Sequence, residues 1–497
     1  MSASGIGSIK MGYDKTKYLE EIERVIEKGK YKDSWESLSC FQVPKWYQNA
    51  KFGIFIHWGV YSVPAFGSEW YPRNMYLKGT KEYEHHMCTY GSHRKFGYRE
   101  FIRMFTAPAF DAKAWADLFK EAGARYVTPV AEHHDGFQMY HSKLSQYCST
   151  KMGPLRDVLN ELKEEIEKSD MVFCTSSHRA EHYWFMEGIR EVDEDNEDLK
   201  EGGLYWPSKK GPEDIYNIYE SCPDKEYLED WLIRTCELID GYKPSMLYFD
   251  WWIMNAAFKP FLKKFMAYYY NRADEWGKQV SINYKFDACA AGTGIEDIER
   301  GQQKDIHYTL WQADTSAARN SWSYTYGNDY KKPEEIIQNL IDIVSKNGTM
   351  MLNIGPKADG SLPEEDIYIL KEIGKWLTIN GEGIYDTKNW KIFGEGPTII
   401  NEGHFSDSKR SPYTCKDVRY TYKKGILYAF ILKWPANGIV KMTNFAPEKK
   451  KVLTGVKSIK VLGYNEIPSW EQLEEGLVIS TETIDSNFPV CFRIEFI

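Results

Sequence analysis

The chain has 497 residues, of which 42% are hydrophobic, so it can bury a large core and is too long for one compact domain. Its net charge of −9 and its pI near 5.8 give no basic footprint, which argues against a nucleic-acid partner. The sequence has no run of about eighteen apolar residues, so no segment is expected to span a membrane.

The N-terminal region predicts a helix that packs outside the main domain. Residues 1–10 contain small side chains but no apolar stretch like that of a signal peptide, so we expect a cytoplasmic protein unless a leader was removed. A charged helical stretch follows at 18–28. The nine cysteines are scattered without CxxC pairs, which fits reduced thiols and no zinc ribbon.

The middle of the chain alternates short apolar runs with helical stretches, the pattern of a β/α protein. The predicted strands lie at 52–56, 126–130, 171–174, 245–249, 279–282, 308–312 and 349–354. The predicted helices lie at 112–122, 155–167, 225–240, 258–274, 334–346 and 364–377. These seven strand–helix steps are close to the eight of a (β/α)8 TIM barrel. A doubly wound sheet would need a Gly-rich turn after its first strand, and none follows.

The last hundred residues have a different pattern of apolar and polar side chains. Short apolar or alternating runs, such as 425–430 and 456–461, are separated by Gly, Asn and Pro. This rhythm predicts a small antiparallel β-sandwich. We therefore expect a barrel with an N-terminal helical extension over 1–385, followed by a C-terminal β-sandwich over 386–497.

Polar side chains recur at the ends of the predicted strands. His57 follows the first strand, 132–135 the second and 176–178 the third, while Asp250 and Lys285 follow the fourth and fifth. The carboxyl ends of parallel barrel strands meet at one face, where active sites lie. We therefore expect these groups to converge on an active site.

The residues around Asp250 indicate a sugar site. Asp250 ends a short apolar run and precedes two tryptophans, Trp251 and Trp252. A carboxylate is unfavourable beside so much apolar surface unless something holds it there for a purpose. Indole faces pack against the C–H surfaces of pyranose rings, whereas a structural Asp that caps the next helix is the alternative.

Two kinds of chemistry fit this cluster. A metal hydrolase would use the histidines and Asp250 as ligands, but His133 and His134 are neighbours, and neighbouring strand residues point to opposite faces. Metal binding is therefore the weaker interpretation. A glycoside hydrolase needs one ionised carboxylate and one that keeps its proton. Asp250 suits the first role, and the second should come from 296–299, on a mobile loop.

Four longer motifs surround these positions. They are KFGIFIHWGVYSVP at 51–64 with SEWY at 68–71, HHDGF at 133–137, VSKNGTMMLNIGPKADG at 344–360, and NGEGIY at 380–385. Together they closely resemble the motifs of the α-L-fucosidases of glycoside hydrolase family 29. The resemblance covers about residues 40–390.

The resemblance implies an exo-acting, retaining double displacement in a (β/α)8-like barrel with a C-terminal β-sandwich, without a metal or other cofactor. It implies that Asp250 is the nucleophile. The residues that it implies for fucose hydroxyls are His57, Glu69, Trp70, His133 and His134. We further expect the wall around the fucose 6-methyl group to consist of Phe55, Trp251 and Trp322.

The resemblance gives two candidates for the general acid/base, and the chain departs from the family pattern at two places. Glu299 fits the family's placement best and Glu296 is the runner-up, with a solvated loop charge as the alternative for either. Lys285 stands where an arginine is expected, so it keeps the charge without the planar fork and should hydrogen bond to the sugar differently. The stretch 176–184 stands where an aromatic lining residue is expected.

The expected partners are fucosylated oligosaccharides or glycoconjugates, with neither nucleic acid nor membrane. The preferred linkage and the oligomeric state stay open, a homo-oligomer included. A catalytically silent fucose-binding protein that kept the pocket is the main alternative, and a metal-dependent barrel hydrolase is a weaker one.

Overall fold

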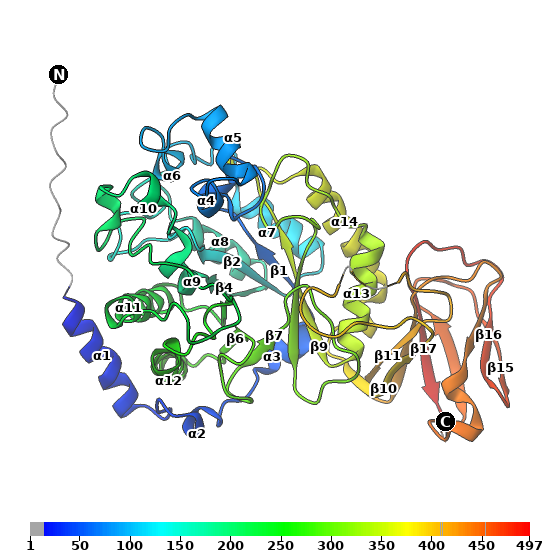
Figure 1. Ribbon diagram of the computed structural model, residues 1–497. Helices are drawn as coiled ribbons and strands as arrows, with labels where there is room; N and C mark the ends of the chain where they lie inside the picture. The colour runs from blue at the N-terminus through cyan, green and yellow to red at the C-terminus, as the bar shows by residue number, and fades with distance from the viewer. Residues whose placement is uncertain (1–13, 408, 410, 453) are drawn as a thin grey trace.

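The computed structural model describes residues 14–497, with the exception of 408, 410 and 453. A closed barrel of parallel strands is followed by two antiparallel sheets, which lie on the right-hand side of Figure 1 beyond α13 and α14. The predicted barrel with a C-terminal β domain is therefore confirmed.

The barrel closes because its first strand pairs on both sides. The strand order is β1-β9-β8-β7-β6-β5-β4-β2-β3, and β1 also pairs with β2. The strands β3 and β4 both pair with β2 and together occupy one strand position of the barrel, so these nine strands fill eight positions. Their bounds are β1 Phe52–Ile56, β2 Tyr126–Glu132, β3 Val172–Phe173, β4 Thr175–Ser177, β5 Met246–Phe249, β6 Ser281–Lys285, β7 Ile295–Asp297, β8 Trp311–Ser316 and β9 Gly348–Ile354.

One barrel strand, β7, was not predicted. The sequence placed 296–299 on a mobile loop, whereas Ile295–Asp297 pairs in parallel with β6, and Lys285 lies opposite Asp297. A strand of three residues with two acidic side chains gives no apolar run, so periodicity alone misses it. Lys285, like Glu132, is the last residue of its strand and not the first residue of the following loop.

The helices surround the barrel as in other β/α folds, although α1 packs on the outside against α11 and α12 (Figure 1). Neither connection beside β7 contains a helix, and both lie within the described residues. The helix bounds are α1 Lys15–Lys28, α2 Trp35–Leu38, α3 Lys45–Ala50, α4 Tyr71–Asn74, α5 Lys81–Thr89, α6 Tyr98–Phe101, α7 Ala112–Glu121, α8 Val158–Lys168, α9 Arg179–Phe185, α10 Ile189–Val192, α11 Lys225–Tyr242, α12 Phe258–Trp276, α13 Pro333–Ser345 and α14 Glu364–Asn380.

The C-terminal part consists of two sheets that share one apolar core. The five-stranded sheet has the order β10 (Lys388–Glu395), β11 (Val418–Lys423), β12 (Ile426–Ile431), β17 (Val490–Phe496), β14 (Val456–Val461). The three-stranded sheet has the order β13 (Ile439–Met442), β16 (Gly476–Ser480), β15 (Ser469–Leu473). A buried ion pair fixes the larger sheet to α13, since Arg419 Nε lies 2.5 Å from Asp342 Oδ1.

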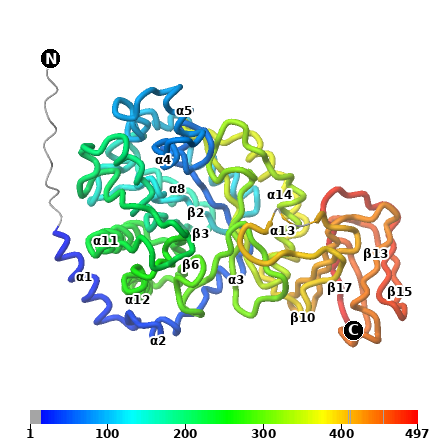
Figure 2. Tube along the Cα trace, in the orientation of Figure 1, coloured from blue at the N-terminus to red at the C-terminus, as the bar shows by residue number. Residues whose placement is uncertain are grey.

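The connection between β10 and β11, residues 396–417, leaves the C-terminal part and returns to the barrel. In Figure 2 it is the golden loop that reaches back over the barrel strands. Gly403 N–H donates to the carbonyl of Gln302 at 3.0 Å, so the loop is tied to the segment that follows β7.

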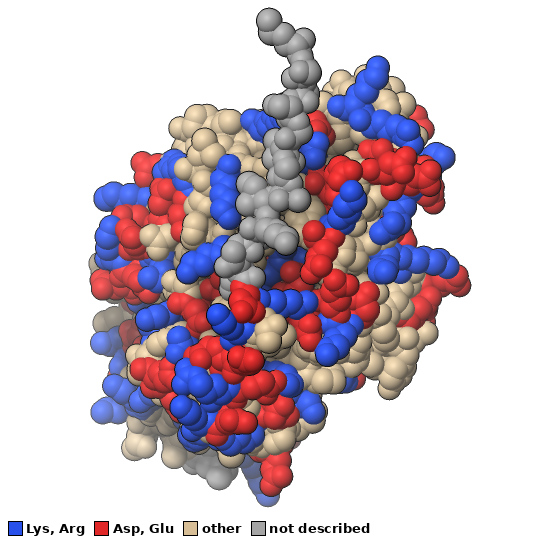
Figure 3. Space-filling view, turned by 90° about the vertical axis from the view of Figure 1, so that its left-hand side faces the viewer, with Lys and Arg blue, Asp and Glu red and all other residues tan. Residues whose placement is uncertain are grey.

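The charges on the outside are mixed in sign. Figure 3 shows acidic and basic side chains interspersed over the face that carries the N-terminal helix. The described part of this face therefore offers no extended basic surface of the kind that binds nucleic acid. Among the described residues, no helix is both long enough and apolar enough to cross a membrane.

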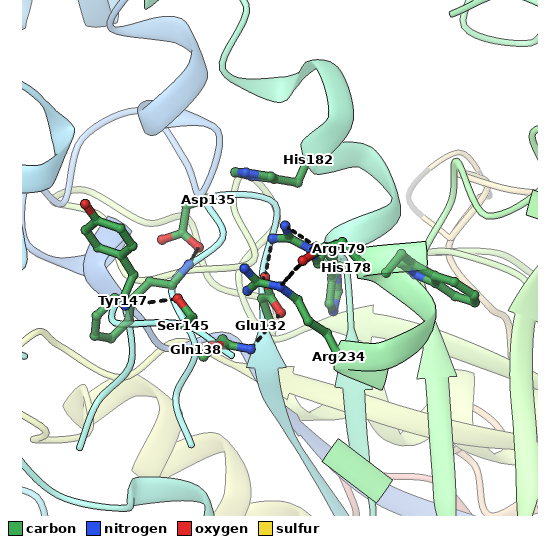
Figure 4. A network of polar contacts seen from close by, with 12 residues as sticks. Glu132, Asp135, Gln138, Ser145, Tyr147, His178, Arg179, His182 and Arg234 are labelled. Carbon is green, nitrogen blue, oxygen red and sulfur yellow. Dashed lines mark hydrogen bonds and ion pairs between the residues drawn. The ribbon is translucent and has the colours of Figure 1, made fainter. Parts of the chain in front are cut away.

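A buried ion-pair network joins the ends of β2 and β4 (Figure 4). Arg179 Nη1 lies 2.7 Å from Glu132 Oε1, and its Nη2 lies 2.7 Å from Asp230 Oδ2. Arg234 also approaches Glu132, at 3.5 Å. Glu132 directly precedes His133 in the chain and Arg179 directly follows His178, so the network fixes both segments from which these histidines project.

We expect Arg179→Met to lower the free energy of unfolding by about 3 kcal/mol, because Glu132 would keep a buried charge with only the more distant Arg234 to compensate it. Urea denaturation measures the change. The control is Lys113→Met, which breaks the exposed Lys113–Asp117 pair and should leave the midpoint unchanged. Equal shifts for the two variants would contradict a special role for the buried network.

Candidate active site

A cavity of about 710 Å³ opens at the carboxyl ends of the barrel strands. All but one of the predicted site residues line it, and they come from segments far apart in the sequence. They are Phe55, His57, Glu69, Trp70, His133, His134, Asp250, Trp251, Glu299 and Trp322. The exception is Lys285, which is fully buried beneath the cavity.

Asp250 stands directly after β5 and carries a negative charge. His178 Nδ1 lies 2.9 Å from its Oδ2, and His134 Nε2 lies 3.4 Å from the same oxygen. Burial alone would raise the pKa of Asp250, but the two histidines and the charge of Lys285 hold that pKa well below its ordinary value. Because both contacts use Oδ2, neither occupies Oδ1.

His134 is a cation that lies between two carboxylates. Its Nδ1–H donates to the carbonyl of His178 at 2.9 Å, and its Nε2 lies 3.1 Å from Glu181 Oε2 as well as near Asp250. Burial opposes the charge, but Glu181 and Asp250 raise the pKa of His134 to about 9. Burial, together with the charge of Asp250, raises the pKa of Glu181 to about 7.

His57 and His133 are neutral, because burial lowers both of their pKa values well below the ordinary value. His57 Nδ1 pairs with Asn353 Oδ1 at 2.7 Å, which holds the ring at the end of β1. Among the described residues, His133 Nδ1 has no hydrogen-bond partner. A buried polar atom without a partner is costly, and a ligand hydroxyl would satisfy this one.

Glu69 is nearly buried and is held by the loop that follows β8. Its Oε2 accepts hydrogen bonds from the backbone N–H of Trp322 at 2.9 Å and from Ser321 Oγ at 3.1 Å. These donors fix the position of the carboxylate. Arg300 stacks over the Trp322 ring at 4.6 Å, which holds that indole in the cavity wall.

Glu299 stands two residues after β7 with its side chain 15% exposed. Burial raises its pKa to about 7, with Lys285 lowering it and the charge of Asp250 raising it. Glu299 is therefore poised to hold a proton near neutral pH. Glu296, the runner-up from the sequence, does not line the cavity and lies on the other face of β7 from the inward-facing Asp297.

Lys285 was expected to contact the sugar, and its position explains why it does not line the cavity. Its Nζ lies 2.7 Å from Asp297, 3.3 Å from Asp314 and 3.4 Å from Glu299. Three carboxyl groups surround the ammonium group inside the barrel, so its charge acts on Glu299 from the barrel interior.

Several lining residues were missed by sequence reasoning. His178 had been noted as a strand-end group, and that position was the available signal for it. Phe286 carried the same signal, because it directly follows Lys285 at the end of β6. Phe405 and Asp407 gave no such signal, because they come from the β10–β11 connection, far from any strand end of the barrel.

Two groups of potential metal ligands lie in the cavity, and in each the ligand atoms lie within 4.8 Å of one another. They are His57, His133 and His178, and His134, His178 and Asp250. His133 and His134 fall in different groups, as expected of neighbours that cannot easily hold one ion, although both line the cavity with their rings 4.3 Å apart. Both residues follow the end of β2, where strand alternation no longer applies. Both ring nitrogens of His178 already have partners, Ser176 Oγ at 2.9 Å and Asp250, so they are less available to an ion.

Comparisons with known proteins agree with this architecture. The family model described as alpha-L-fucosidase matches residues 19–382, and that of the alpha-L-fucosidase C-terminal domain matches 411–492. The human tissue alpha-L-fucosidase is 30% identical over 93% of this chain and 90% of its own length. The mouse protein of the same name is 30% identical over 94% and 93%.

Solved structures give the same result. A structure titled alpha-L-fucosidase superposes with a TM-score of 0.75 at 28% identity and covers 94% of this chain and 100% of its own. The Thermotoga maritima alpha-fucosidase in complex with fucose superposes with a TM-score of 0.72 at 27% identity, covering 93% and 99%. The chain therefore belongs to the alpha-L-fucosidase family of glycoside hydrolases.

Proposed function

We propose that this chain is an exo-acting α-L-fucosidase that releases terminal α-L-fucose from oligosaccharides or glycoconjugates with retention of configuration. The observation that carries the proposal is that one cavity holds two carboxyl groups in different surroundings, Asp250 against two histidines and Glu299 beside Lys285. Asp250 has a depressed pKa and is ionised, whereas the pKa of Glu299 is raised to about 7. A retaining glycosidase needs this combination.

In the first step, Asp250 attacks the anomeric carbon and Glu299 gives its proton to the leaving oxygen. Since His134 and His178 hold Oδ2 of Asp250, the attack comes from Oδ1. In the second step, Glu299 takes a proton from water, and the water oxygen displaces Asp250 from the sugar. The two inversions leave the configuration unchanged.

Binding of fucose is assigned to the polar and apolar parts of the cavity. The proposed partners of the hydroxyl groups are Glu69, Trp70 and the histidines 57, 133 and 134, and those of the 6-methyl group are Phe55, Trp251 and Trp322. The Thermotoga maritima relative that has been solved with fucose supports this choice of sugar. The cytoplasmic location and the oligomeric state stay predictions.

Substitution of the two carboxylates tests the assignment. With 4-nitrophenyl α-L-fucoside, we expect Asp250→Gly to lower kcat about 10⁴-fold or more, because the nucleophile is lost. Azide should restore turnover and give the β-fucosyl azide. Glu299→Ala should lower kcat/KM about 10² to 10⁴-fold for methyl α-L-fucoside and less for the nitrophenyl substrate, whose leaving group needs less protonation.

Glu296→Ala is the matched control for Glu299→Ala, and it should keep wild-type kcat/KM. Azide added to Glu299→Ala should give the α-fucosyl azide, since two displacements still occur. Full activity of Glu299→Ala with loss in Glu296→Ala would reverse the assignment. A wild-type protein that binds fucose without hydrolysing any fucoside would instead support the silent binding protein.

The pKa values predict the pH profile. Glu299 must be protonated in the first step, so kcat/KM for methyl α-L-fucoside should fall as the pH rises through about 7. Asp250 must be ionised, and its depressed pKa places the acidic fall below the range in which an ordinary Asp carboxyl titrates. An alkaline limb that persists in Glu299→Gln would show that another group titrates.

Chelation separates this proposal from a metal-dependent hydrolase. We expect dialysis against EDTA to leave kcat unchanged, because the imidazole nitrogens of His178 and His134 are held by protein partners. Loss of activity that Zn²⁺ restores would favour the metal-dependent mechanism.

A further inference from the structure

A group of aromatic and apolar side chains lines the cavity on the side of Glu299. Phe405 is 46% exposed, Tyr216 63% and Ile215 43%. Phe286 lies between them, with its ring 6.3 Å from that of Tyr216 and stacked on His404 at 4.2 Å. Large apolar side chains that stay exposed around one cavity mark a binding surface.

Phe405 belongs to the β10–β11 connection, which is bonded directly to the backbone of Glu299. Phe405 N–H donates to the carbonyl of Glu299 at 2.8 Å, and Glu299 N–H donates to His404 Nδ1 at 3.1 Å. Asp407 N–H donates to the carbonyl of Arg300 at 2.8 Å. The C-terminal part of the chain thus supplies residues to the cavity and holds the segment that carries the proposed acid/base.

Asp407 fixes the loop to the barrel itself. Its carboxylate lies 2.5 Å from Lys331 Nζ and accepts a hydrogen bond from Thr315 Oγ1 at 2.8 Å. Thr315 is a residue of β8, so Phe405 has a defined place relative to the barrel strands. A surface that is built in this way loses little freedom when a ligand binds.

The position of this surface identifies its ligand. A general acid lies beside the glycosidic oxygen, so the groups around Glu299 face the leaving group rather than the fucose ring. Aromatic rings pack against the C–H faces of a pyranose and tolerate several arrangements of its hydroxyls. The chemistry therefore fits a neutral hexopyranose.

We propose that Phe405, with Phe286 and Tyr216, forms the binding site for the pyranose ring that bears the fucose, so that the C-terminal part of the chain takes part in substrate recognition. This inference rests on the proposed fucosidase activity and names the leaving group for that same site.

The test compares kcat/KM for a disaccharide, fucose α-linked to galactose or to N-acetylglucosamine, with kcat/KM for α-L-fucosyl fluoride. Fluoride has no ring to stack, whereas a nitrophenyl group would occupy the same surface. We expect Phe405→Ala to lower the ratio of the two constants about tenfold, and Phe405→Tyr, which keeps the ring, to restore it. The control is Tyr368→Ala, since Tyr368 is an exposed aromatic residue on α14 outside the cavity.

Tyr216→Ala, at a more exposed position of a different segment, should lower the same ratio and serves if Phe405→Ala does not fold. An unchanged ratio in both alanine variants would overturn this inference and leave the fucosidase proposal intact. Wild-type protein that cleaves the fluoride but neither disaccharide would also overturn the inference alone. Wild-type protein that cleaves no fucoside would overturn both.

Discussion

The organisation of the barrel's carboxyl end depends on keeping Asp250 ionised. An isolated carboxylate at this depth would lose several kcal/mol of hydration. Contacts from His178 and His134 and the nearby charge of Lys285 offset that loss. These three side chains project from the ends of β4, β2 and β6. Their interactions with the charge of Asp250 therefore hold the ends of several barrel strands in one arrangement.

Glu299 shows how the same cavity can keep a second carboxyl group protonated. Its neighbour Lys285 also contacts Asp297 and Asp314, so one positive charge is shared among three carboxyl groups. The attraction that would ionise Glu299 is diluted, and burial prevails. The lysine keeps a positive charge in the place where the family pattern suggests an arginine, and its contacts with Asp297 and Asp314 hold it inside the barrel beside Glu299.

The barrel also depends on what lies outside it. The buried pair of Asp342 and Arg419 fixes the larger C-terminal sheet to α13, and the β10–β11 connection then returns to the segment that follows β7. The C-terminal part therefore does more than extend the chain beyond the barrel. Its contacts with Glu299 and Arg300 make it part of the cavity wall.

The barrel, the C-terminal β domain and the family could all be predicted from the amino-acid sequence, and all but one of the residues predicted for the site line the cavity. Apolar runs that end in a polar residue, as at His57 and Asp250, report buried parallel strands and their exposed ends. Such signals are local and need no knowledge of neighbours. Motifs that carry both packing and polar groups made the family recognisable in the same stretches.

Other features emerged only from the folded chain. The folded chain makes Ile295–Asp297 a barrel strand, because the pairing partner of Asp297 is a lysine on another strand. It placed Glu299 and not Glu296 in the cavity wall, and it buried Lys285 among carboxyl groups that are distant in the sequence. It also brought Phe405 to the cavity from beyond residue 400. The pairing of buried charges and the return of the β10–β11 connection to the barrel both depend on contacts between segments that are remote in the sequence. No local sequence pattern encodes such contacts.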